Sequence, residues 1–105
     1  KSEVLIEMML CKHKIPFRYE SPLLLGNTLL YPDFTIRHPQ TGDYYYWEHF
    51  GLMDSPSYIE NASSKINLYA SSGITLGIRL ITTYETKNQP LNPELIEMYI
   101  NYHFS

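Results

Sequence analysis

Two acidic side chains stand in an apolar, strand-like stretch of the chain, LLYPDFTIRHPQTGDYYYWEHFG. Asp33 directly follows Pro32, and Glu48 directly follows Trp47. Side chains alternate between the two faces of a strand, so Asp33 lies on the face opposite Phe34, and Glu48 on the face opposite Trp47. If the apolar side chains enter the core, the two carboxylates can converge on the other side of one sheet.

Two carboxylates that lie close together repel each other, and one of them binds a proton unless a cation lies between them. A divalent metal ion removes this conflict. Mg²⁺, or Mn²⁺ in its place, is the natural candidate, because it is a hard ion that is held by one or two carboxylates together with water and substrate phosphate oxygens. The pattern therefore favours a Mg²⁺ site between Asp33 and Glu48.

The length and composition of the chain place both acids in one compact domain. The sequence has 105 residues, of which 44% are hydrophobic, and this suffices for a single core. The chain begins with Lys1 rather than Met, and its last residues are still apolar and helix-like. We expect residues 1–105 to be a single domain of a longer protein.

Charge and cysteine content exclude several classes of protein. The formal net charge of −3 argues against a broad basic face that grips nucleic acid, so affinity for nucleic acid would be local or supplied by other domains of the parent chain. Cys11 is the only cysteine, which rules out an intrachain disulfide and favours a reduced, cytoplasmic setting. No stretch approaches the roughly 20 apolar residues of a membrane span, so no membrane partner is expected.

The apolar pattern and the turn residues predict the element order αβββαβα, with a central mixed sheet flanked by helices. Ser2, Ser55 and Asn92 are suitable helix caps, and the last two are each followed by Pro, which is favoured in the first helical turn. The residues HPQTGD form a turn between two strands, which predicts an antiparallel hairpin. Helices are expected at 2–13, 57–72 and 93–103, and strands at 17–24, 29–37, 44–49 and 74–83.

The segment ITLGIRLITT is nearly continuous in apolar and β-branched residues. Such a run is typical of a strand that is buried on both faces. Because a helix precedes it, we expect this strand to cross over and lie parallel to a neighbour. The first three strands are expected to form an antiparallel meander.

Six segments follow one another in the order of an αβββαβ framework: SEVLIEMML, YESPL, PDFTI, YYYWEHFG, SSKINLYASSGI and LITT. In this order they resemble the PD-(D/E)xK nuclease superfamily, and the resemblance covers nearly the whole chain. It implies a restriction-endonuclease-like core and a Mg²⁺-dependent deoxyribonuclease that hydrolyses phosphodiester bonds in DNA.

The resemblance also implies roles for individual residues. Asp33 matches the first acid of the motif and Glu48 the second, and both would bind the metal ion. Glu3 matches an acid that many members supply from the first helix, although Glu7, one turn further on, could fill this place. His49 would offer its backbone carbonyl to the metal ion.

The sequence departs from the motif where the catalytic lysine is expected, because this position holds Phe50. In some members of the superfamily the lysine has migrated to the following helix, and Lys65 lies in that helix here. Its ammonium group would orient the attacking water or stabilise the charge of the transition state. Tyr69, one helical turn from Lys65, and Glu20 are candidates to hold the ligands in place.

Other interpretations remain open on the sequence alone. Phe50 could record the loss of activity in a domain that only binds nucleic acid or protein. The chain could also be an unrelated interaction domain, with Glu48 paired to Arg18 or Arg37 and with Lys65 in solvent. The tyrosines at 44–46 could stack on nucleic-acid bases or pack within the sheet.

Overall fold

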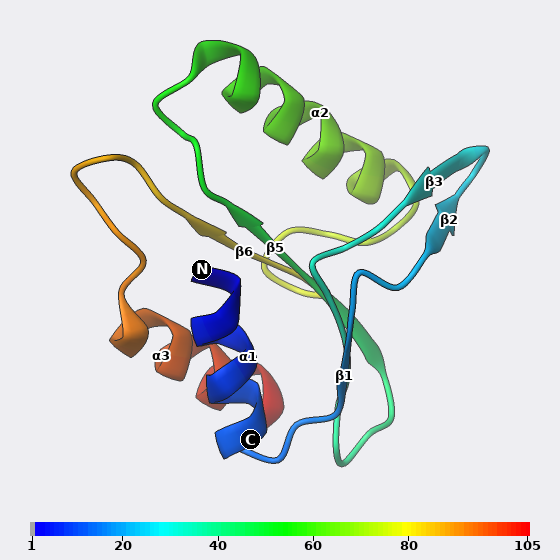
Figure 1. Cartoon of the computed structure of the whole chain (residues 1–105). Helices are drawn as coiled ribbons and strands as arrows, with labels where there is room; N and C mark the ends of the chain where they lie inside the picture. The colour runs from blue at the N-terminus through cyan, green and yellow to red at the C-terminus, as the bar shows by residue number, and fades with distance from the viewer. Residues whose placement is uncertain (1) are drawn as a thin grey trace.

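The computed structural model describes residues 2–105, and four strands form its central sheet in the order β1-β4-β5-β6 (Figure 1). β1 pairs with β4 and β4 with β5 in antiparallel orientation, whereas β5 and β6 are parallel. The predicted mixed sheet and the parallel crossover through a helix are therefore confirmed. The strands are β1 (Phe17–Tyr19), β4 (Phe34–Arg37), β5 (Tyr44–Phe50) and β6 (Leu80–Tyr84).

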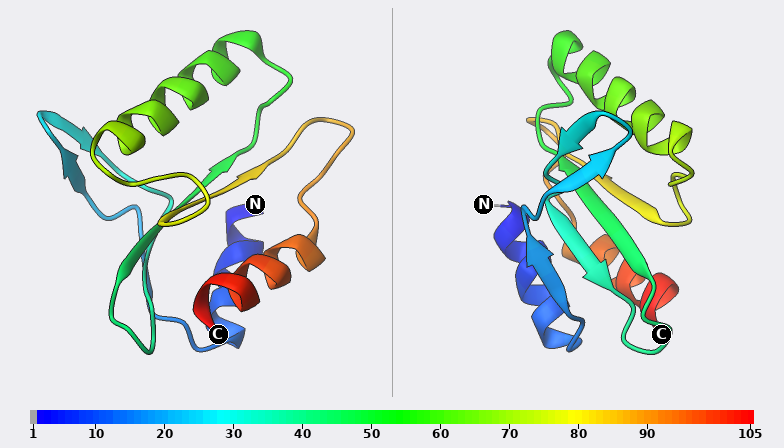
Figure 2. Two further views of the ribbon diagram at one scale, coloured as in Figure 1. Left: turned by 180° about the vertical axis from the view of Figure 1, so that it is seen from behind. Right: turned by 90° about the vertical axis from the view of Figure 1, so that its right-hand side faces the viewer.

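Helices cover both faces of this sheet (Figures 1 and 2). α1 (Ser2–Lys12) and α3 (Pro93–Phe104) lie together on one face, and α2 (Pro56–Ser71) lies on the other. The side chain of Ser55 accepts a hydrogen bond from the Tyr58 N–H, and that of Asn92 accepts one from the Glu94 N–H. Both predicted caps are present, and all three helices end within one residue of the predicted positions.

Two hydrophobic clusters fill the spaces between the sheet and the helices. The cluster under α1 and α3 contains Phe34, Ile36 and Trp47 from the sheet. The cluster under α2 contains Tyr69 and Leu80, with the partly buried Tyr46 packed against it. The strand residues thus alternate between the two faces as the sequence predicts, with Phe34 and Trp47 away from α2.

The two longest strands predicted for the first half of the chain are each divided in two. β2 (Leu23–Leu25) and β3 (Thr28–Leu30) leave the central sheet and form a separate antiparallel hairpin. Glu20 directly follows β1, and its backbone has the left-handed conformation, with φ 49°, which ends the strand. Pro22 and Pro32 flank the hairpin, and neither can donate a backbone hydrogen bond to a sheet.

The apolar run at 74–83 is shorter as a strand than the sequence predicts. Only Leu80–Tyr84 forms β6, and a turn precedes it in which Gly77 has a φ of 85°. Ile78 is 63% exposed in this turn. The predicted burial on both faces therefore holds for β6 but not for the residues before it.

The register of β4 and β5 brings the two acids of the sequence motif to adjacent strands. Phe34 lies opposite Trp47, so the next step outward along both antiparallel strands puts Asp33 opposite Glu48.

Within residues 2–105, no helix is long and apolar enough to cross a membrane.

Candidate active site

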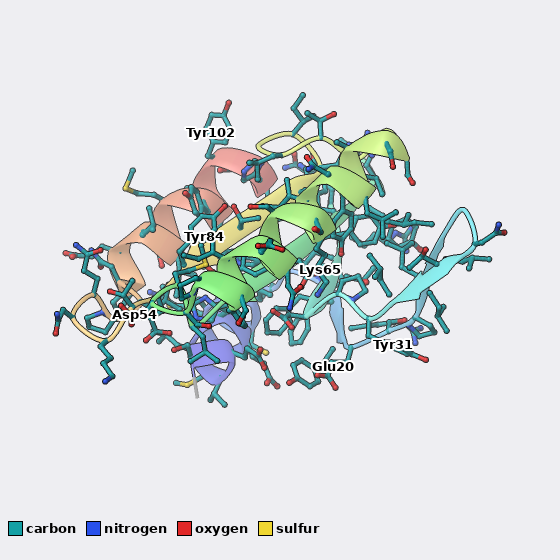
Figure 3. The ribbon with its side chains drawn as sticks, turned by 90° about the horizontal axis from the view of Figure 1, so that it is seen from above. Glu20, Tyr31, Asp54, Lys65, Tyr84 and Tyr102 are labelled. Atoms are coloured by element: carbon teal, nitrogen blue, oxygen red, sulfur yellow. The ribbon has the colours of Figure 1, made fainter. Side chains whose placement is uncertain are left out.

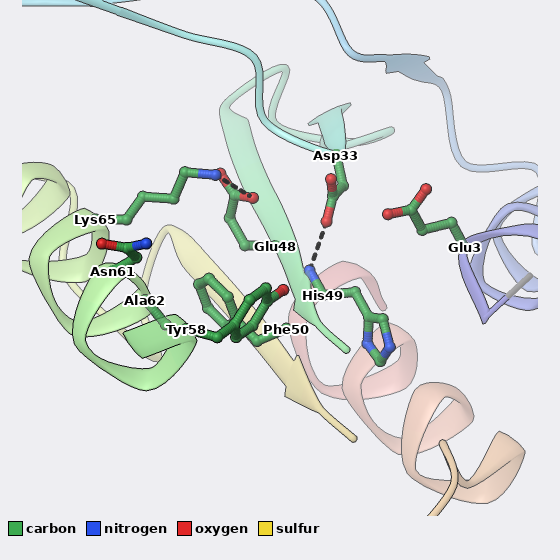
Figure 4. A pocket seen from close by; sticks show the side chains of 9 residues that line it. All are labelled: Glu3, Asp33, Glu48, His49, Phe50, Tyr58, Asn61, Ala62 and Lys65. Atoms are coloured by element: carbon green, nitrogen blue, oxygen red, sulfur yellow. Dashed lines mark hydrogen bonds and ion pairs between the residues drawn. The ribbon is translucent and has the colours of Figure 1, made fainter. Parts of the chain in front are cut away.

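A cleft of ≈ 220 Å³ lies where the start of α1, the β4 and β5 strands and α2 meet (Figure 4). It brings together Asp33 and Glu48 from the sheet, Lys65 from α2 and Glu3 from α1. These four side chains are the ones that the sequence resemblance assigns to catalysis. The full lining is Glu3, Asp33, Glu48, His49, Phe50, Tyr58, Asn61, Ala62 and Lys65.

Glu48 is a buried carboxylate with a partner for each oxygen. Lys65 Nζ lies 3.3 Å from its Oε1, and the Tyr69 hydroxyl donates to its Oε2 at 2.6 Å. The side chain of Glu48 is only 2% exposed, and a buried charge requires such compensation. Glu48 therefore pairs with Lys65, and the pairing with Arg18 or Arg37 that the sequence left open does not occur.

Asp33 directly precedes β4 and is hydrogen-bonded to the backbone of the neighbouring strand, β5. Its Oδ2 accepts a hydrogen bond of 2.7 Å from the backbone N–H of His49. Burial raises the pKa of the Asp33 carboxyl from 3.8 to about 7, and repulsion from Glu48 and Glu3 adds to the rise. The His49 N–H and the Lys65 ammonium oppose it. A cation beside Asp33 would relieve this repulsion and keep the carboxylate ionised at neutral pH.

Glu3 stands at the rim of the cleft, in the first turn of α1. Its Oε1 accepts a hydrogen bond of 2.7 Å from the hydroxyl of Tyr19 on β1, and this bond raises the pKa of Tyr19. Glu7 is exposed and does not line the cleft. The structure thus places Glu3, and not Glu7, with the other acids, and it adds Tyr19 as a residue that fixes Glu3.

The other predicted supporting residues have different positions. Tyr69 is fully buried and holds Glu48 directly. Glu20 is exposed, lies at the periphery of the molecule (Figure 3) and does not line the cleft. It lies close enough to the Tyr19 hydroxyl to raise the pKa of that group.

The backbone groups and the ring of His49 point in different directions and have different partners. The N–H of His49 points to Asp33, and the carbonyl of the same residue points to the same edge, since both groups of a strand residue face one neighbour. The predicted contribution of this carbonyl to a metal site is thus compatible with the strand geometry. The ring is directed away from Lys65 and Glu48 (Figure 4).

A buried polar network surrounds that ring and was not predicted from the sequence. Nδ1 of His49 lies 2.8 Å from Thr83 Oγ1, and Nε2 lies 2.8 Å from Glu85 Oε1. Trp47 Nε1 donates to Thr83 Oγ1 at 3.2 Å, and Ser2 Oγ donates to Glu85 Oε1 at 2.6 Å. The network connects the start of α1, next to Glu3, to the strand that carries Glu48.

Phe50 faces α2, as Glu48 does, at the position where the resemblance leads us to expect a lysine. Its side chain is buried, stacks on Tyr84 with ring centroids 5.7 Å apart, and meets Tyr58 edge to face. Lys65 enters the cleft from the helix above, and its side chain is 34% exposed. The ammonium group therefore touches both a buried acid and the open cleft, where it could reach a substrate.

The donor groups of the cleft fit only a loosely held metal ion. Among residues 2–105, no three His, Cys, Asp or Glu side chains lie close enough together to enclose one. Two carboxylates, a backbone carbonyl and water suit Mg²⁺, which keeps several waters when it binds proteins. They do not suit a closed structural zinc site.

Comparison with protein-family models, with curated proteins and with solved structures gives no match for this chain.

Proposed function

We propose that this domain is a metal-dependent nuclease that hydrolyses phosphodiester bonds in DNA. The observation that carries the proposal is the meeting of Asp33, Glu48 and the Lys65 ammonium in one cleft, although they come from three separate elements. A salt bridge for stability alone would not require a second acid with a raised pKa beside it. The resemblance to the PD-(D/E)xK superfamily supports the choice of DNA as the substrate.

Asp33 and Glu48 would hold Mg²⁺ or Mn²⁺, with the His49 carbonyl as a further ligand and Glu3 at the rim. Bound there, the metal ion would polarise a phosphoryl oxygen and lower the pKa of a bound water. Glu3 is fixed by Tyr19 and faces the same cleft, where it can accept a hydrogen bond from a water molecule.

Lys65 supplies the positive charge that the strand position lacks. Its ammonium group is held at 3.3 Å from Glu48, so it is positioned before the substrate arrives. A charge fixed in this way stabilises the negative charge that develops on the phosphoryl group in the transition state, without reorganisation during the reaction. Tyr69 keeps Glu48 from rotating away, because it holds the second carboxylate oxygen.

One observation favours a second candidate, a nuclease-like domain that binds without cutting. Both oxygens of Glu48 already have partners in the protein, Lys65 and Tyr69. A carboxylate satisfied in this way does not need a metal ion, and Phe50 occupies the place of the catalytic lysine. In this alternative the cleft is a structural ion pair in a domain that binds nucleic acid or another protein.

Cleavage of labelled DNA separates the two candidates. Single-stranded, duplex and branched oligonucleotides are incubated with the parent protein in Mg²⁺ or Mn²⁺, and with EDTA as the blank. We expect cutting by the parent only with metal, and loss of cutting in Asp33→Asn. The matched control is Asp54→Asn, which removes an exposed carboxylate outside the cleft. No cleavage of any substrate form by the parent would favour the binding domain.

A further inference from the structure

Part of the central sheet is not covered by a helix on the α2 side (Figure 2, right). Arg18 of β1 lies opposite Thr35 of β4, and Arg37 of β4 lies opposite Tyr44 of β5. Directly opposite residues share a face, and positions 33, 35 and 37 alternate onto the same side of β4. We call Arg18, Thr35, Arg37 and Tyr44 the open face. With Pro16 and Phe17 they line a hollow of ≈ 510 Å³.

The open face concentrates positive charge in a chain that is acidic as a whole. Arg18 and Arg37 are exposed, and neither forms an ion pair with a carboxylate in the described part of the chain. Two other acids near them in the sequence, Asp43 and Glu20, are engaged elsewhere. Asp43 pairs with Arg79 at 3.3 Å, and Glu20 lies near the Tyr19 hydroxyl. Two guanidinium groups are thus free to bind an anion, and guanidinium geometry matches phosphate.

Tyr44 gives this face an aromatic surface as well. Tyr45 packs edge to face on Phe104, and Tyr46 lies beside Tyr69 under α2. Tyr44 is 54% exposed, and within residues 2–105 its ring contacts no other aromatic ring. An exposed ring next to two arginines can stack on a base while the arginines hold phosphates, which is the usual arrangement for binding single strands.

The open face is close to the cleft on the same side of the sheet. Asp33 and Arg37 are four residue steps apart along the β4 segment, which corresponds to about 13 Å. Phosphates of one strand rise about 3.4 Å per nucleotide along a duplex axis, so this span covers about four nucleotides or fewer. The β2–β3 hairpin lies on this side too, where its Leu25 packs with Tyr69 and Tyr46.

We propose that the open face binds the nucleic-acid strand that flanks the phosphate held in the cleft. Arg18 and Arg37 contact its phosphates, and Tyr44 stacks on one of its bases. The inference rests on the proposed function, because it takes the substrate to be a nucleic acid. It adds where the substrate lies, and it explains how an acidic domain acquires local affinity for a polyanion.

Binding is measured without metal, so that cleavage does not interfere. Fluorescence anisotropy follows a labelled 20-nucleotide single strand in EDTA, over a series of salt concentrations, with the parent and with the double variant Arg18→Gln/Arg37→Gln. Loss of two phosphate contacts should lower the slope of log K against log salt by about 1.4 and weaken binding by about 20-fold at 0.1 M salt. Tyr44→Ala should weaken it by about fivefold or more.

The matched control is Lys12→Gln/Lys87→Gln, which removes the same charge from exposed positions outside the open face. We expect this control to keep the slope of the parent, and circular dichroism verifies that all variants are folded. The inference is wrong if both double variants lose the same affinity, if the parent does not bind the strand, or if polyglutamate competes as well as DNA per charge. Binding through the open face by a parent that never cuts would refute the proposed nuclease and leave the binding site in place.

Discussion

Replacement of Asp33 by Asn should stabilise the metal-free protein at alkaline pH, although it alters a residue of the candidate active site. The Asp33 carboxylate is partly buried and is repelled by Glu48 and Glu3. Asn at this position keeps an oxygen that can accept the hydrogen bond from the His49 N–H, and it carries no charge. The substitution therefore removes the cost of burying the charge together with the repulsion, and it leaves the hydrogen bond.

The size of the effect follows from the pKa of Asp33. The rise from 3.8 to about 7 is roughly 3 units, which corresponds to at most about 4 kcal/mol. Because the side chain is not fully buried, screening by solvent reduces this to about 2 kcal/mol. The folded protein holds a proton on Asp33 more tightly than the unfolded chain does. Its stability should therefore fall as pH rises from about 4 to 7 and stay low above that range.

Urea unfolding in EDTA at pH 4 and pH 8, followed by the fluorescence of Trp47, measures this difference. The parent should lose about 2 kcal/mol more than Asp33→Asn between the two pH values, and the variant should be the more stable protein at pH 8. Titrating groups away from the cleft act equally in both proteins and cancel in the comparison. Asp54→Asn should follow the parent. An equal pH dependence in parent and variant, or a variant that is less stable at pH 8, would refute the raised pKa of Asp33 on which the prediction depends.

Three further predictions concern the partners of the two acids. Lys65→Ala should lower kcat by about a hundredfold or more and leave Mn²⁺ binding intact or tighter. The double variant Lys65→Ala/Phe50→Lys should recover part of the cleavage. An unchanged kcat in Lys65→Ala would exclude Lys65 from catalysis. Millimolar Mn²⁺ should raise the melting temperature of the parent, and the shift should disappear in Asp33→Asn; a shift that persists would place the ion elsewhere. Tyr69→Phe removes a hydrogen bond to the buried charge of Glu48 and should cost about 2 kcal/mol in urea unfolding; a loss within experimental error would show that water replaces the hydroxyl.

The alternation of side chains is sufficient to predict which residues of β4 and β5 share a face of the sheet. Phe34 and Trp47 are fully buried, and their neighbours Asp33 and Glu48 share the other side. This part of the site depends on local geometry, which a single sequence contains.

The β2–β3 hairpin was missed because leucine-rich segments on both sides of its turn continue the strand pattern. The breaks depend on the prolines and on the left-handed conformation of Glu20.

Two parts of the site depend on contacts that no local pattern contains. The His49 network requires that β6 lie parallel to β5 in one register, with His49 opposite Thr83. The sequence predicted the parallel pairing but not the register. The meeting of Lys65 with Glu48 depends on how α2 crosses the sheet, and only the resemblance to the nuclease superfamily indicated it. The choice of Glu3 over Glu7 likewise required the position of α1 relative to β1.

The central claim is that Asp33 and Glu48 together hold a divalent cation, and direct titration with Mn²⁺ tests it most directly. Electron paramagnetic resonance of free Mn²⁺ gives the number of ions bound by the parent, Asp33→Asn and Asp54→Asn at pH 8. The account predicts one ion for each chain of the parent and of Asp54→Asn, and loss of this ion in Asp33→Asn. A parent that binds no Mn²⁺ at millimolar concentration, or an Asp33→Asn protein that binds it as tightly as the parent, would contradict the account.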